Sequence, residues 1–162
     1  MTALQSPSVP VSWGELLDKL TILEIKAQRI ASPAARANIA REQALLHAAA
    51  TEVLAHSGVQ PLLVALRAVN QRLWDIEDAI RQEDAQARFG RHFIRLARAV
   101  YHENDARAAI KREINAILGS ELVEEKSYWS AAEPPLVAAE TGARGVATCA
   151  APAIAPAIAQ AA

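Results

Sequence analysis

Four polar residues recur at helical spacing in the segment from Arg91 to Ser120: Asn104, Arg107, Lys111 and Asn115. Residues three and four apart lie on one face of a helix, so these side chains line up along about three turns. The same face carries the apolar residues of the segment, which are Phe93, Leu96, Ala97, Val100, Ile114 and Leu118. This polar row therefore lies in a stripe that would otherwise be core.

Two cations in the polar row require negative partners. Arg107 and Lys111 are like charges four residues apart, and a cation in a low-dielectric core is costly unless it is paired. The sequence offers three acidic partners: Glu24, in the apolar arc expected for the first helix, Glu77, beside the apolar seam of the third, and Glu103, four residues before Arg107. One interpretation is a closed network of internal ion pairs that fixes how the helices pack.

The alternative is a small-anion site in the core of a helical bundle. Arg107 and Lys111 would then hold a carboxylate or phosphate, and the two asparagines of the row would orient it. Glu24 or Glu77 would be the acid/base candidates of such a site. The pattern assigns no catalytic residue.

The chain around this row predicts four helices. Ser12 and Glu15 have the spacing of a capping box, and Ser32-Pro33 suits the start of a second helix. The clearest amphipathic stripe comprises Leu62, Leu66, Val69, Leu73, Ile76 and Ile80. Gly119 suits the left-handed position that ends a helix. We expect an all-α fold, an antiparallel bundle of about four helices spanning roughly residues 12–31, 33–57, 61–88 and 91–118.

The folded domain is expected to cover residues 12–129. Residues 1–11 contain two prolines and no charged side chain, which predicts a flexible leader. Residues 130–162 are rich in Ala and Pro, and their prolines preclude a continuous helix. We expect this stretch to be a disordered tail.

Composition narrows the classes of function. Lys plus Arg (17) nearly cancels Asp plus Glu (18) in a chain of 162 residues, so no bulk charge attracts nucleic acid or anionic lipid. Cys149 is the single cysteine, which excludes an intrachain disulfide and a cysteine-based zinc site. No metal-binding or phosphate-loop motif is present, and no metal or cofactor is expected. The absence of a signal sequence and of a long charge-free apolar segment before the tail predicts a cytoplasmic protein without a membrane span.

Two further features lie outside the polar row. Arg91, Arg95, Arg98 and His102 share the opposite arc of the fourth helix, and we expect them to form a solvated face. A nucleic-acid partner is not expected, because the net charge is near zero and no aromatic residue is interleaved for base stacking. Trp74 lies on the third helix away from its apolar seam, which predicts a second packing surface against a neighbouring helix or a second copy.

Four separated segments resemble a bacterial family catalogued as domain of unknown function 6165. They are SWGELLDKLTILEIK (12–26), LWDIEDAIR (73–81), FIRLARAVYHENDARAAIKREIN (93–115) and LGSELVEEKSY (118–128). The resemblance covers about residues 11–129. It implies a small, mostly helical, cytoplasmic protein in which Asn104, Asp105, Arg107, Lys111 and Arg112 recur, and it implies no activity.

Together these observations favour an interaction or accessory module over an enzyme. We expect it to form a homo-oligomer or to bind a protein partner, with the polar row mainly structural. The small-anion site at Arg107 and Lys111 remains the alternative.

Overall fold

The computed structural model describes residues 7–125, and these contain four helices and no strand. The helices are α1 (Trp13–Arg29), α2 (Pro33–Leu54), α3 (Gln60–Ala85) and α4 (Arg91–Leu118). The predicted all-α fold is confirmed, although α2 and α3 each end three residues earlier than expected. None of these helices is long and apolar enough to cross a lipid bilayer. The predictions for residues 1–6 and for the tail, together with the end of the predicted domain, fall outside the described residues.

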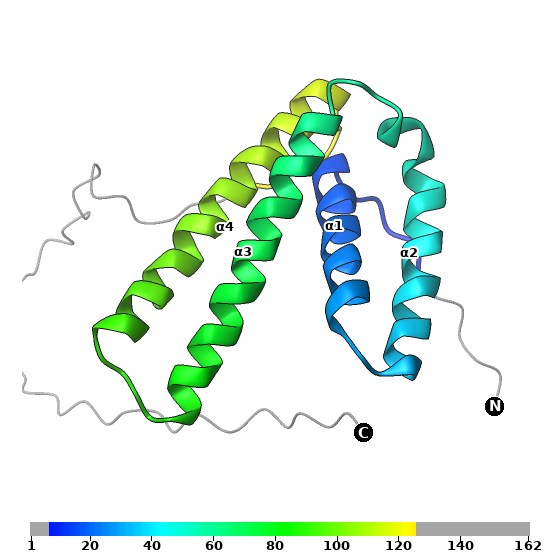
Figure 1. Ribbon diagram of the computed structural model, residues 1–162. Helices are drawn as coiled ribbons and strands as arrows, with labels where there is room; N and C mark the ends of the chain where they lie inside the picture. The colour runs from blue at the N-terminus through cyan, green and yellow to red at the C-terminus, as the bar shows by residue number, and fades with distance from the viewer. Residues whose placement is uncertain (1–6, 126–162) are drawn as a thin grey trace, which may run out of the picture. The chain divides into compact units, whose positions relative to one another are not determined.

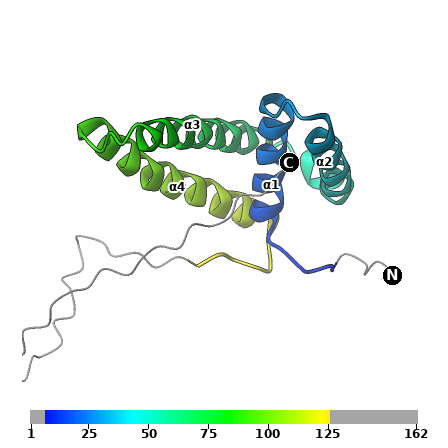
Figure 2. The same cartoon turned by 90° about the horizontal axis from the view of Figure 1, so that it is seen from below.

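The four helices form two antiparallel hairpins. Figure 1 shows α1 and α2 running in opposite directions as one pair, and α3 and α4 as a longer second pair. Helix α1 packs against each of the other three helices, whereas α2 packs mainly against α1. Figure 2 shows α1 between α2 and the α3–α4 pair. The shortest helix is therefore the central one.

Helix α1 can occupy this position because it carries buried residues on more than one side. Leu16, Leu17, Leu20, Leu23 and Ile25 are all buried along its length. Leu16, Leu17 and Leu20 belong to one core cluster, whose other buried members are Ala50, Val53, Val59, Leu66 and Ile114. Burial on several sides is what the Leu- and Ile-rich sequence of this segment predicts.

Local signals set the ends of the helices. The Ser12 hydroxyl accepts from the Glu15 N–H at 3.3 Å, and the Ser32 hydroxyl accepts from the Ala35 N–H at 3.4 Å. Pro33 opens α2, where its missing N–H has no consequence. Gly119 ends α4 in the left-handed conformation, with a φ of 59°. These predicted start and stop signals are confirmed.

Candidate functional site

The predicted polar row of α4 divides into two parts with different surroundings. Lys111 and Asn115 lie where the C-terminal part of α4 meets the start of α1. Asn104 and Arg107 line a cleft between α1, α3 and α4. The four residues share a face of α4, but they do not form one site.

Asn115 caps the N-terminus of α1. Its side-chain oxygen accepts from the Gly14 N–H at 2.7 Å, and the Ser120 hydroxyl accepts from the Trp13 N–H at 3.4 Å. With Ser12 bonded to Glu15, each of the first three N–H groups of α1 has an acceptor. These groups have no partner inside their own helix. The end of α4 therefore completes the start of α1.

The two helices approach closely at this junction. A Cβ atom placed on Gly14 would lie 2.7 Å from the Lys111 carbonyl oxygen and 3.0 Å from the Asn115 side-chain oxygen. No side chain fits in that space. Glycine at this position allows the hydrogen bond between Asn115 and the α1 backbone.

Lys111 is enclosed at the same junction, with 6% of its side chain exposed. Its Nζ pairs with the Glu15 carboxylate and lies 2.5 Å from Oε2 of Glu124. Burial lowers the pKa of Lys111, but the hydrogen bonds to Glu124 and Glu15 more than compensate, so the pKa is raised. The ammonium group is thus charged and is paired with two carboxylates. Glu15 therefore pairs with another helix, while only the serine of the predicted capping box acts as a cap.

The predicted acidic partners lie elsewhere. Glu24 Oε2 is 3.4 Å from Arg67 Nη1, beside a smaller cavity of about 230 Å³ bordered by α1, α2 and α3. Glu77 pairs with Arg81 one turn along α3, at 3.1 Å. The expected closed network joining Glu24 and Glu77 to Arg107 and Lys111 does not form. Helical periodicity placed Glu24 on the apolar arc of α1, but its side chain lies beside α2 and α3 rather than α4.

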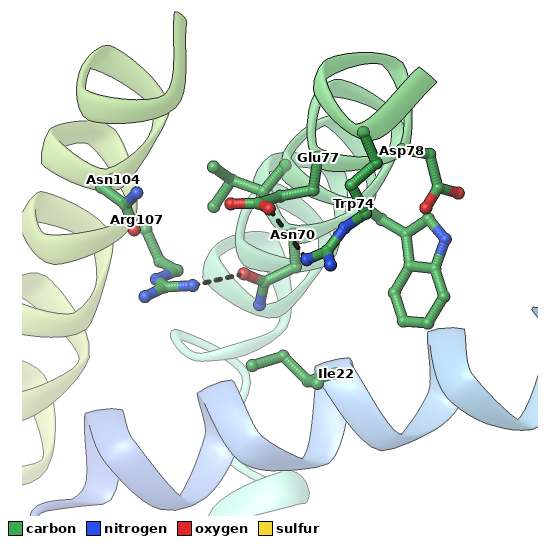
Figure 3. A pocket seen from close by; sticks show the side chains of 9 residues that line it. Ile22, Asn70, Trp74, Glu77, Asp78, Asn104 and Arg107 are labelled. Atoms are coloured by element: carbon green, nitrogen blue, oxygen red, sulfur yellow. Dashed lines mark hydrogen bonds and ion pairs between the residues drawn. The ribbon is translucent and has the colours of Figure 1, made fainter. Parts of the chain in front are cut away.

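The cleft has a volume of about 660 Å³ and mixed polarity. Its lining comprises Ile22 of α1, Asn70, Leu73, Trp74, Glu77, Asp78 and Arg81 of α3, and Asn104 and Arg107 of α4. Figure 3 shows Arg107 on the α4 side, facing Asn70, with Trp74 and Asp78 toward the far side of α3. Trp74 thus lines the cleft. The sequence had predicted that it marks a second packing surface. No group of three or more potential metal-ligating side chains occurs among residues 7–125.

Arg107 is incompletely bonded within this cleft. Its Nη1 donates to the Asn70 side-chain oxygen at 3.4 Å, a long contact. Its Nε is buried and has no hydrogen-bond partner, and within the described part of the chain no carboxylate pairs with it. A buried charged donor without an acceptor costs roughly 1–3 kcal/mol or more. The guanidinium therefore has unused capacity to bind an anion.

A buried polar cluster, which the sequence did not reveal, holds Asn70 against Arg107. The Asn70 amide nitrogen donates to Asp18 Oδ1 at 2.7 Å and to Thr21 Oγ1 at 2.8 Å. Both N–H bonds of this amide are used, so its oxygen is left to face Arg107. The available signal was the position of Asn70, four residues after Leu66 and three before Leu73, inside the apolar stripe of α3.

An ion pair joins α3 to α4 near the cleft. Arg72 contacts Glu103 twice, with Nε 2.9 Å from Oε1 and Nη2 2.8 Å from Oε2. The hydrogen bond to Glu103 raises the pKa of the Arg72 guanidinium. Glu103 is thereby bound to α3 and does not neutralise Arg107, four residues along the same helix.

Comparison with known proteins supplies a family but no ligand. The family model described as "Family of unknown function (DUF6165)" matches residues 8–141. No curated protein and no solved structure matches the chain. A function must therefore be argued from the cleft itself.

Proposed function

Because this chain belongs to the family of unknown function (DUF6165), whose description assigns no activity, we propose a function from geometry alone. The protein is a helical binding module, and its cleft between α1, α3 and α4 receives an anionic group at Arg107. The supporting observation is the buried Nε of Arg107, which has no partner beside an open cleft. Lys111 is not part of this site, because its ammonium group is already paired with Glu15 and Glu124.

The free edge of the guanidinium favours a carboxylate or phosphate. With Nη1 directed to Asn70, the Nε and Nη2 groups have no acceptor among the described residues. An arginine binds two oxygens of an anion in parallel through such a pair, and the guanidinium would turn towards the cleft to do so, because Nε is buried. Asn104 lies on the same wall; its amide donates one N–H to the Val100 carbonyl at 2.8 Å and keeps a second. Ile22, Leu73 and Trp74 offer apolar contact to the remainder of the ligand.

Titration with two simple probes tests this site. Succinate and inorganic phosphate are added separately to the full-length protein, and the arginine Nε–H resonances are followed by NMR. We expect a saturable shift of one resonance, which is missing from the spectrum of Arg107→Gln.

The matched control is Arg112→Gln, which removes an exposed arginine one turn further along α4. This variant should bind both probes as the wild type does. Absence of a saturable shift with either probe, or the same titration in Arg107→Gln, would overturn the proposal.

A second candidate function is self-association through α2 and α3. Leu45 on α2 is 69% exposed and Val64 on α3 is 71% exposed. The smaller cavity, bordered by α1, α2 and α3, includes Val64 in its lining. A second copy that covered these side chains would bury them. The molar mass from light scattering at micromolar concentration should be that of a dimer for the wild type and that of a monomer for Val64→Glu. A monomeric wild type would contradict self-association.

The cytoplasm is the proposed location. The single cysteine, Cys149, supports a reducing compartment, since it leaves no partner for an intrachain disulfide. Fractionation of cells that express the full chain tests the location, and secretion into the medium would contradict it.

A further inference from the structure

One part of the molecule concentrates positive charge. The stretch from Arg88 to His102 contains four arginines and two histidines and no acidic residue, although the whole chain has a net charge of −1. Arg88 pairs with Glu83, at 2.5 Å. Arg91, Arg95 and Arg98 have no carboxylate partner within the described chain; Arg95 contacts His92, and Arg98 donates to the Tyr101 hydroxyl at 3.1 Å.

Large apolar side chains are exposed among these arginines. Phe89 is 56% exposed, Ile94 55% and Tyr101 48%. Ile94 and Tyr101 are seven residues apart and therefore lie on one side of α4, two turns from each other. Phe89 makes an edge-to-face contact with Phe93, at 5.2 Å between ring centroids, and otherwise faces outward from the turn before α4.

This basic and apolar surface lies at the projecting end of the α3–α4 hairpin. Figure 1 shows the turn between α3 and α4 at the end of the hairpin that is distant from α1 and α2. The perpendicular view in Figure 2 shows the same separation. A flat partner can therefore reach Phe89 and the first turns of α4 without meeting α1 or α2.

We propose that this surface, comprising Phe89, Arg91, Ile94, Arg95, Arg98 and Tyr101, docks the protein on an anionic lipid bilayer. The arginines would contact lipid phosphates, while Phe89, Ile94 and Tyr101 enter the interfacial region. A basic helix face with adjacent apolar and aromatic side chains is the composition of helices that lie in such an interface. Phosphate contact alone, as with nucleic acid, would leave the exposed isoleucine and phenylalanine without a role.

Vesicle cosedimentation of the full-length protein tests the proposal. The vesicles contain phosphatidylcholine alone, or phosphatidylcholine with about one third phosphatidylglycerol to supply a negative surface. We expect the protein to sediment with the anionic vesicles only, and to be released as salt is raised. Arg95→Gln and Arg98→Gln should each weaken partitioning about fivefold, the equivalent of about 1 kcal/mol for each basic residue near such a surface.

Apolar variants separate insertion from simple charge attraction. Phe89→Ser with Ile94→Ser should reduce binding at every salt concentration, because salt does not screen the contact of apolar side chains with lipid. The decrease of binding with salt should persist, because the arginines remain. Arg36→Gln on α2 and Ile117→Ser at the other end of α4 alter exposed residues outside this surface. They are the matched controls and should bind as the wild type does. Circular dichroism checks that each variant keeps its helices.

Three outcomes would overturn the proposal. The first is absence of binding to anionic vesicles. The second is an equal loss of binding in the two control variants. The third is binding to polyglutamate or to DNA without binding to vesicles, which would assign the surface to an acidic protein or to nucleic acid. None of these outcomes bears on Arg107, so the cleft is tested separately.

Discussion

Lys111 is held by two carboxylates that are distant in the sequence, Glu15 and Glu124. Replacing Lys111 with Met leaves both carboxylates without their cation. Breaking a fully buried pair costs about 3–5 kcal/mol, but these carboxylates keep contact with solvent, so we expect a loss of about 1–2 kcal/mol. Urea unfolding of the wild type and of Lys111→Met measures this difference in the free energy of unfolding.

The control for this substitution is Lys19→Met. Lys19 pairs with Glu42 at 3.0 Å, and both side chains are about half exposed. Exposed pairs contribute about 0–1 kcal/mol, so this variant should lose clearly less stability than Lys111→Met. Equal losses would show that the junction around Lys111 is not closed.

The raised pKa of Lys111 predicts how its contribution depends on pH. Burial lowers this pKa, but the hydrogen bonds to Glu124 and Glu15 raise it by more, so that it lies above its value in the unfolded chain. The contribution is therefore fully present below the ordinary lysine pKa of about 10.4 and is lost as pH rises through the folded-state pKa. The stability difference between wild type and Lys111→Met should thus stay constant through neutral pH and shrink above about pH 10.4. A difference that shrinks already near neutrality would contradict this assignment.

Replacing Gly14 with alanine should have the opposite effect on stability from most glycine-to-alanine changes in helices. Alanine in place of glycine inside a helix stabilises by about 0.5–1 kcal/mol. At Gly14 the added Cβ would lie 2.7 Å from the Lys111 backbone oxygen, so we expect Gly14→Ala to destabilise instead. Thermal unfolding checks the sign. The control is Gly90→Ser: a Cβ at this N-cap meets no atom within 4 Å, and serine caps slightly better than glycine.

At the scale of the helices, α3 and α4 end in the same hydrogen-bonded motif with different residues. In α3, the Arg88 N–H donates to the Glu83 carbonyl at 2.9 Å, and in α4 the Ser120 N–H donates to the Asn115 carbonyl at 2.9 Å. The left-handed residue is Gly119 in α4 but Ala87, with a φ of 52°, in α3. Left-handed backbone costs a residue with a Cβ roughly 1–2 kcal/mol.

Opposite substitutions at these two positions should have opposite effects. Ala87→Gly is expected to stabilise the protein by about 1 kcal/mol, and Gly119→Ala to destabilise it by a similar amount. Urea unfolding of the two variants provides the measurement. Changes of the same sign would mean that the two helix ends are not equivalent.

Across the whole molecule, the helices differ in how many neighbours hold them. Helix α1 packs against all three others, whereas α2 packs mainly against α1 and buries only Ile39, Ala50 and Val53. We therefore expect α2 to open before α1. Native-state hydrogen exchange should give lower opening free energies for the amides of α2 than for those of α1. Equal opening free energies in both helices would show that α1 and α2 open as one unit.

Most of the fold follows from local features of the sequence. The existence of four helices, the starts at Ser12 and Ser32 and the stop at Gly119 depend on hydrophobic periodicity and on residues three or four positions apart. Such signals act within one helical turn, so no knowledge of the neighbouring helices is needed. The polar character of the row on α4 was readable for the same reason.

The partners of that row were decided only by tertiary structure. Periodicity gives the angle of a residue on its own helix, but the rotation and offset of the facing helix determine which atoms it meets. Lys111 thus meets Glu15 and Glu124 rather than Glu24 or Glu77, and Asn115 caps α1. Arg107, on the same face, is left beside an open cleft with a buried nitrogen unbonded. The sequence alone determined that α4 carries a polar seam; the position of α1 against it decided which half is bonded to other residues and which half borders the cleft.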